Sequence, residues 1–158
     1  MGTTYVFDTN SFRVFGNYYP EAFPSFWERV EELVGAGRIT SCREVAKELE
    51  LQNASEHLGL WCAEHDGLFG DPSADEMAAV ARVFNVPHFQ QLIGQRQQLK
   101  GLPVADPFLV ARGVVRNACV VTEEALKPNA AKLPNVCEHF GVRCTNVQGF
   151  LSEVGWQF

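Results

Sequence analysis

The chain alternates short unbroken apolar runs with longer segments in which apolar residues recur every three or four positions. The short runs predict four strands, at Thr4–Phe7, Arg38–Ser41, Ala118–Thr122 and Val142–Thr145. Unbroken apolar runs are typical of strands that are covered on both faces. The run nearest the N-terminus is therefore expected in the middle of a parallel sheet rather than at its edge.

The longer segments predict amphipathic helices between these strands. They cover Ser11–Gly16, Phe23–Gly35, a helix capped by Ser41, Ser55–Phe69, Ala74–Val86, Asp106–Asn117, Pro134–Phe140 and Val147–Val154. The glutamine-rich segment Phe89–Lys100 is predicted as either a polar surface helix or a mobile segment beside the site. Four or five short strands alternating with helices indicate an α/β fold with a central parallel sheet and helices on both faces. Repeats, low-complexity tracts and linkers are missing from the sequence, so we predict one domain over residues 1–158.

Composition narrows the class of protein. The 158 residues are 46% hydrophobic and 20% charged, which is ordinary for a globular domain. The chain lacks an apolar stretch of about 18 residues, so we expect no membrane span. Five scattered cysteines suit a reducing cytoplasm. The net charge of −6 disfavours general nucleic-acid binding unless acids gather around a metal ion.

Four acidic positions follow strand ends or open helices. They are Asp8, Glu48 (or Glu44), Asp106 and Glu124 (or Glu123). The carboxyl ends of parallel strands share one edge of a sheet, where ligands bind in open α/β folds. Clustered carboxylates repel one another unless hard cations occupy the cluster, and oxygen ligands favour Mg²⁺ or Mn²⁺. Metal-assisted hydrolysis of a phosphodiester is the chemistry that this arrangement serves best.

Simpler explanations exist for several of these residues. Asp8 and Asn10 belong to the residue types that cap helices, and Asp106 stands before Pro107 as a natural helix start. Glu44 lies three residues after Ser41, as in a capping box. Because Glu48 has no such structural explanation, this asymmetry favours Glu48 as the functional acid.

Cysteine and histidine residues occur in two further groups. Their spacings match no standard zinc site, and packing explains them better than metal binding. The groups are His57, Cys62 and His65, and Cys137, His139 and Cys144.

Four stretches in order, YVFDTNSF, VAKEL, ADPFLVARG and VVTEE, resemble the PIN-domain nucleases. The ending LPNVCEHFGVRCTNVQGFL looks like a bacterial PIN-like subfamily catalogued as a domain of unknown function. The resemblance implies a three-layer α/β/α sandwich and a ribonuclease that cleaves single-stranded RNA with Mg²⁺ or Mn²⁺. It also suggests the toxin of a toxin–antitoxin pair, with an antitoxin protein as partner, and a homodimer.

The resemblance assigns roles residue by residue. Asp8, Glu48, Asp106 and Glu124 match the catalytic and metal-binding acids, and Asn10 and Thr122 match supporting polar residues. Glu124 stands where the family usually has Asp, which puts a second metal ion in doubt. Basic residues expected to flank the acids and contact RNA are Arg43, Lys47, Arg96, Lys100 and Lys127.

Two other functions are weighed against a nuclease. An acid phosphatase would need a second aspartate two residues after Asp8, where this chain has Asn10. A PIN-like fold that has lost catalysis and serves as a binding module remains the alternative, because fold does not determine function. Binding of a divalent metal ion discriminates between a nuclease and a binding module.

Overall fold

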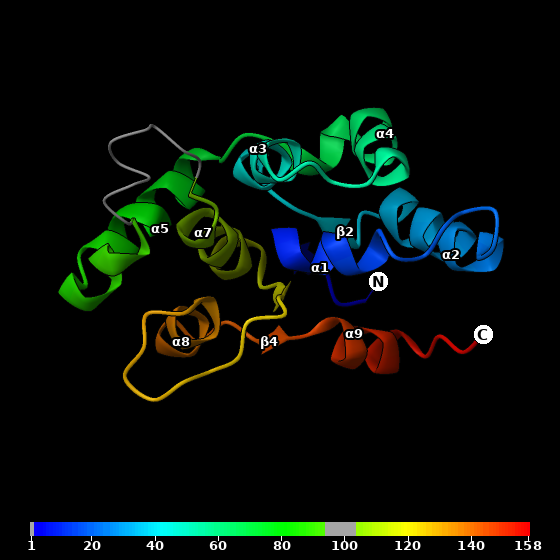
Figure 1. Cartoon of the computed structure of the whole chain (residues 1–158). Helices are drawn as coiled ribbons and strands as arrows, with labels where there is room; N and C mark the ends of the chain where they lie inside the picture. Colours follow the sequence, from blue (N-terminus) through cyan, green and yellow to red (C-terminus); the bar gives the residue numbers. More distant parts are fainter. Residues whose placement is uncertain (1, 94–103) are drawn as a thin grey trace.

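Four short parallel strands form the centre of the fold in the computed structural model, which describes residues 2–93 and 104–158 (Figure 1). The strands are β1 (Tyr5–Phe7), β2 (Ile39–Thr40), β3 (Cys119–Val121) and β4 (Cys144–Thr145). The α-helices are α1 (Thr9–Phe15), α2 (Pro24–Gly35), α3 (Arg43–Leu51), α4 (Glu56–Glu64), α5 (Ala74–Phe84), α7 (Asp106–Arg116), α8 (Leu133–His139) and α9 (Val147–Val154). Two 3₁₀-helices, η1 (Asp66–Phe69) and η2 (Pro87–Leu92), complete the described elements.

The strand order is β2-β1-β3-β4, and every pair is parallel. β1 therefore lies inside the sheet, which confirms the prediction made from its apolar run. From β1 the chain crosses first to β2 on one side and later to β3 on the other. Such a change of direction separates the loops that leave β1 and β3 and leaves a crevice for ligands at their carboxyl ends.

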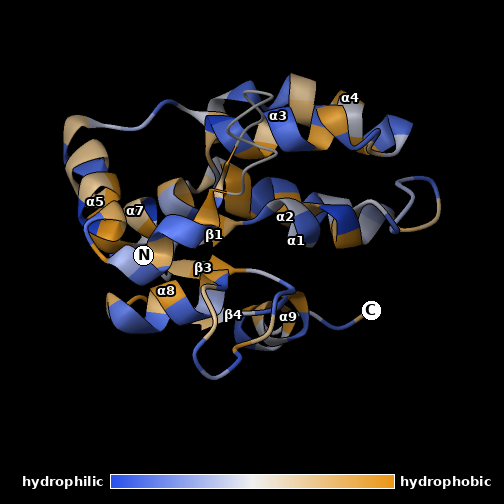
Figure 2. Cartoon of the chain, turned by 60° about the vertical axis from the view of Figure 1, so that its left-hand side comes forward, coloured by the Kyte–Doolittle hydropathy of each residue, from blue (hydrophilic) through white to orange (hydrophobic). Residues whose placement is uncertain are grey.

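Helices cover both faces of this sheet. On one face Tyr5 and Phe7 of β1 contact Phe150 of α9, with ring centroids 4.8 and 5.0 Å apart. On the other face α7 approaches so closely that a Cβ atom on Gly113 would lie 3.3 Å from a methyl group of Val120. Figure 2 shows α7 on one side of β1 and β3, and α1, α2 and α9 on the other. The three-layer α/β/α arrangement is thus the predicted one.

The single helix predicted over Ser55–Phe69 was wrong: α4 ends at Glu64, and η1 follows it. The predicted caps of two helices also differ from the structure. Ser41 does not cap α3: its hydroxyl donates to the Phe7 carbonyl oxygen at 2.7 Å, and Cys42 stands at the cap position. Burial next to β1 gives Ser41 a backbone acceptor outside its own helix, so the expected capping box does not form. A capping box forms instead at α5, between Ser73 and Glu76.

Asp106 also occupies a different position from the predicted one. Ala105 is the residue before α7, and Asp106 is the first helical residue, without a side-chain capping hydrogen bond. Its carboxylate is therefore not explained as a cap. The glutamine-rich segment Phe89–Lys100 is described only as far as η2, and residues 94–103 lie outside the described part. Among the described residues, none of the helices has the length and apolar character needed to cross a membrane.

Candidate functional site

Asp8 leaves β1 directly and lies almost entirely buried, with 5% of its surface exposed. Its backbone N–H extends the ladder to β3 by donating to Val121 O at 2.9 Å. One carboxylate oxygen accepts the Thr9 N–H at 2.7 Å and the other accepts the Thr122 hydroxyl at 2.7 Å. Burial raises the pKa of Asp8 to about 6; these two hydrogen bonds oppose the rise, and the nearby Glu124 adds to it. Asp8 therefore caps α1, as its residue type predicted, and also faces the carboxylates described below.

A polar network joins the loop after β1 to the loop after β3. Asn10 accepts the Glu123 N–H at 3.0 Å, and the Ser11 hydroxyl donates to Val121 O at 2.9 Å. Thr122 Oγ1 in turn accepts the backbone N–H of Glu124 at 3.2 Å. These contacts hold the two strand ends in register. Asn10 and Thr122, expected as supporting residues, both lie in this network.

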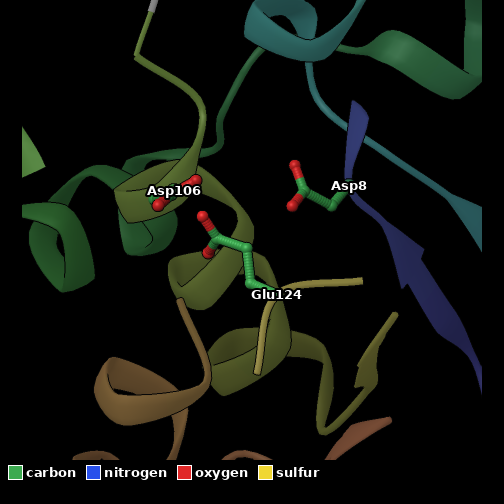
Figure 3. A group of neighbouring side chains, drawn as sticks. All are labelled: Asp8, Asp106 and Glu124. Atoms are coloured by element: carbon green, nitrogen blue, oxygen red, sulfur yellow. The ribbon is translucent and has the colours of Figure 1, made fainter. Parts of the chain in front are cut away.

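Three carboxylates from separate parts of the chain converge beside it. Oxygens of Asp8, Asp106 and Glu124 lie within 4.8 Å of one another, and Figure 3 shows the three side chains pointing toward a common space. Asp106 projects from the first turn of α7. One oxygen of Glu124 accepts the Leu133 N–H at the start of α8 at 3.0 Å, which holds this longer side chain in place.

The environment of Asp106 disfavours its charge. Burial is the largest influence, followed by the neighbouring carboxylates of Asp8, Glu124 and Glu48, and together they raise the pKa of Asp106 well above its usual value. Lys132 acts in the opposite direction. Negative charges at this site repel one another, and a bound cation would relieve the repulsion.

Glu48 on α3 lines the same cavity but lies outside the group of three. Its two oxygens accept the Thr9 hydroxyl at 2.7 Å and the Ala105 N–H at 3.1 Å. Burial raises the pKa of Glu48, the hydrogen bond from Thr9 lowers it, and the charge of Asp8 raises it further. The two donors orient the Glu48 carboxylate between the start of α1 and the start of α7.

The alternative glutamates are engaged in other contacts. Glu44 lies 3.0 Å from the guanidinium of Arg43 and 3.9 Å from the ammonium of Lys47 and does not line this cavity. Glu123 lines the cavity, but one of its oxygens accepts the Val147 N–H at the start of α9 at 2.7 Å. Glu124 therefore belongs to the converging group and Glu48 contacts residues beside it, whereas Glu44 pairs with Arg43 and Glu123 contacts the start of α9.

The cavity beside the acids has a volume of about 690 Å³ and continues between α1 and the segment that joins α3 to α4. Besides the acids it is lined by polar side chains, which include Arg13, Asn17, Tyr19, Gln52, Asn53 and Ser55. The acidic group thus stands at one part of a larger polar hollow.

Of the basic residues expected to contact RNA, Arg43 and Lys47 line a different hollow, between α3 and α4, and Lys127 lies exposed in the loop after β3. Arg96 and Lys100 lie outside the described residues. Two cations near the acids had not been predicted: Arg13, which lines the cavity, and Lys132, which influences Asp106. Arg13 lies five residues after Asp8 on the helix that Asp8 caps, and this spacing is the signal that could have found it.

The donor set fits a hard divalent cation. Asp8, Asp106 and Glu124 supply only carboxylate oxygens, the ligand type that Mg²⁺ and Mn²⁺ prefer, and the cavity beside them has room for water ligands. The raised pKa values of Asp8 and Asp106 agree with a site that is stabilised when positive charge enters it.

Without metal, the protein should lose stability as pH rises. Asp8 titrates at about 6 in the folded protein and near 3.8 in the unfolded chain, so the folded state binds more protons between these values. The free energy of unfolding should therefore fall by about 2–3 kcal/mol for this group from about pH 4 to 7. Thermal melting in chelator across this range checks the sign, and Asp8→Asn should flatten the curve. A wild-type curve that rises toward pH 7, or is as flat as that of the variant, would contradict the expectation.

Comparison with known proteins identifies a family and a similar solved structure. A family model described as "Domain of unknown function (DUF4411)" matches residues 5–158. A search of curated proteins found no match. The solved structure described as "Crystal structure of VapBC2 from Rickettsia felis bound to a DNA fragment from their promoter" matches with a TM-score of 0.48 and 18% sequence identity. The match covers 90% of this chain and 98% of that chain.

Proposed function

We propose that this chain, which belongs to the DUF4411 family as its C-terminal sequence predicted, is a metal-dependent ribonuclease that hydrolyses phosphodiester bonds of single-stranded RNA. The observation that carries the proposal is the convergence of Asp8, Asp106 and Glu124 within 4.8 Å beside a polar cavity. Their resemblance to the acids of the PIN-domain nucleases supports the same conclusion.

In this proposal Asp8, Asp106 and Glu124 hold Mg²⁺ or Mn²⁺. A bound ion of this kind polarises a phosphodiester and lowers the pKa of water, and two ions about 4 Å apart also stabilise the leaving oxygen. Thr122 and the Thr9 N–H orient the Asp8 carboxylate. Such supporting hydrogen bonds fix the direction of a metal ligand and tune its basicity.

Glu48 completes the proposed site as a fourth acid. Because Thr9 and the Ala105 N–H hold its carboxylate, Glu48 can accept hydrogen bonds from water at the cavity wall without moving its side chain. This position suits a ligand that acts through water or a group that orients the attacking water. Glutamate in place of aspartate at Glu124 gives a longer reach, and Leu133 N–H restrains it.

The resemblance to PIN-domain nucleases further leads us to propose a role as the toxin of a toxin–antitoxin pair, with an antitoxin protein as partner. The toxin role predicts that expression of the wild type arrests growth and that Asp8→Asn, which alters the proposed metal site, abolishes the arrest. Growth of both strains from the same inducible promoter is the measurement. Equal growth with soluble protein and measurable ribonuclease activity would contradict the toxin role but leave the nuclease intact.

The direct test of hydrolysis uses purified protein and a labelled single-stranded RNA. We expect cleavage with Mn²⁺, loss of cleavage in chelator and loss of cleavage in Asp106→Asn. Mn²⁺ binding without cleavage of RNA would contradict the proposed activity. Binding of neither metal nor RNA by folded protein would favour a non-catalytic binding module.

Substitutions of the two glutamates on α3, Glu44 and Glu48, should differ in their effect on RNA cleavage. Glu48→Gln should lower cleavage by about 10²-fold or more, because it removes a charge beside the acids, whereas its amide can still accept from Ala105 N–H and donate to Thr9. Its stability should change by no more than about 1 kcal/mol. Glu44→Gln is the matched control and should retain most activity, because Glu44 contacts Arg43 and Lys47 outside the cavity. Cleavage rates of the two variants under identical Mn²⁺ check this, and the reverse order would show that the functional acid is Glu44.

A further inference from the structure

The cavity is larger than the acidic group requires. Its volume is about 690 Å³. A water molecule takes up about 30 Å³ of liquid, so an ion with six waters would fill roughly 200 Å³. The rest of the hollow lies along α1 and the segment between α3 and α4, where its lining changes from carboxylates to Arg13, Tyr19 and Ser55. Room and donors therefore remain for a second part of a ligand.

Tyr19 presents an aromatic surface at this end of the cavity. It is 61% exposed, whereas Phe12, Phe15 and Phe26 nearby are buried in the core. Its backbone carbonyl accepts the N–H groups of Ala22 and Phe23, at 3.0 and 2.9 Å, so a tight turn holds the residue in place. An exposed aromatic ring at a polar cavity is the kind of platform on which nucleic-acid bases stack.

Arg13 supplies the positive charge in the same hollow. Although the cavity contains several acids, no carboxylate of the described residues lies within 4.0 Å of its guanidinium. Its one described hydrogen bond is to the neutral Gln52 side chain, at 2.7 Å. The remaining guanidinium donors are arranged to bind an oxyanion such as a phosphate.

We propose that Arg13 and Tyr19 form a nucleotide subsite beside the acids. Arg13 binds the phosphate next to the one that is cleaved, and Tyr19 stacks on an unpaired base. Stacking on Tyr19 requires a base that is free of a duplex, so the subsite accepts single strands. The statement that the phosphate beside the subsite is cleaved rests on the proposed function. The binding of a nucleotide to the subsite does not.

The test measures binding of two short labelled probes, an oligouridylate and the same ribose–phosphate chain without bases, with Ca²⁺ in the buffer. The wild type should bind the oligouridylate more tightly. Tyr19→Leu should weaken that binding roughly 5- to 150-fold and remove the preference over the abasic probe. Arg13→Gln should weaken binding of both probes and flatten the plot of log Kd against log salt by about 0.7. Arg82→Gln, at an exposed arginine on α5 outside the cavity, is the matched control and should leave both unchanged.

The outcomes separate this subsite from hydrolysis, which is measured on the same proteins with Mn²⁺. If Tyr19→Leu and Arg13→Gln bind both probes as the wild type does, or if the wild type binds neither probe, the subsite is overturned, whether or not RNA is cleaved. Base-dependent binding that requires Tyr19 and Arg13, in protein that does not cleave RNA, supports the subsite and overturns the proposed activity. Melting curves of both variants confirm that they are folded.

Discussion

In chelator, Asp106→Asn is expected to melt at a higher temperature than the wild type, whereas millimolar Mn²⁺ is expected to stabilise the wild type far more than the variant. Asp106 lies within 4.8 Å of Asp8 and Glu124 and does not cap α7. Replacing it with the neutral amide removes one of three crowded charges without removing a capping hydrogen bond. Relief of this repulsion should outweigh the small loss of a favourable acid in the first turn of a helix.

The metal effect follows from mass action. An ion that binds only the folded protein stabilises it by about 2.7 kcal/mol at a concentration of 100 times Kd. For a chain of this size, this corresponds to a rise of roughly 5–10 °C in melting temperature. Differential scanning fluorimetry at neutral pH, in chelator and then in Mn²⁺, measures both effects.

Asp75→Asn provides a matched control for this experiment. Asp75 is also an acid in the first turn of a helix, but it is exposed on α5 and outside the acidic group. Its substitution should change neither the melting temperature in chelator nor the response to Mn²⁺. If Asp106→Asn behaves like Asp75→Asn, the three carboxylates do not form a shared metal site.

The second large effect is expected from Arg112, whose loss should lower the free energy of unfolding by about 3–5 kcal/mol. Arg112 on α7 is 2% exposed, and its Nε donates to Glu76 of α5 at 2.7 Å. Other N–H groups of Arg112 donate to the backbone carbonyls of Ser41, Gly70 and Asp71. Arg112→Met would leave the Glu76 carboxylate buried and unpaired, and three carbonyls without this donor.

The pKa of Glu76 agrees with this pairing. Burial raises the pKa of Glu76, but hydrogen bonds from Arg112 and from the Ser73 N–H lower it more, so the pKa lies below its usual value. Adding Glu76→Leu to Arg112→Met should recover part of the lost stability, because it removes the unpaired charge. The recovery should be incomplete, since the carbonyls of Ser41, Gly70 and Asp71 still lack their donor.

Arg116→Met is the control for Arg112→Met. Arg116 lies on the same helix, one turn later, and is exposed. Its replacement should cost less than about 0.5 kcal/mol. Urea unfolding of the single and double variants gives the comparison, and equal losses for Arg112→Met and Arg116→Met would show that the buried ion pair does not stabilise the fold.

Arg112 also connects the fold to the site. Its contacts join α7, which carries Asp106, to the residue after β2, from which the chain enters α3 with Glu48. A substitution at Arg112 should therefore disturb the acidic group as well as the stability. The sequence placed Arg112 in a helix but offered no sign of this link, because its partners lie 36 to 71 positions away in the chain.

The local pattern of the sequence determined the elements of this protein. The apolar runs predicted all four described strands, and the central place of β1 followed from a run without polar residues. The positions of acids beyond strand ends or at helix starts predicted that Asp8, Glu48, Asp106 and Glu124 would share one edge of the sheet. The structure brings Asp8, Asp106 and Glu124 together, with Glu48 lining the same cavity. These features follow from the periodicity of hydrophobic residues and from the order of strands and helices. Both can be read from one sequence.

Only the tertiary structure decided what depends on contacts across the chain. Ser41 bonds to Phe7 and not to its own helix, so the apparent capping box with Glu44 was wrong. Asp106 lies one position inside α7, and Arg13 reaches the cavity while Arg43 and Lys47 line another hollow. A side chain chooses among local and distant partners by burial and geometry, and those distant partners meet only when the chain has folded.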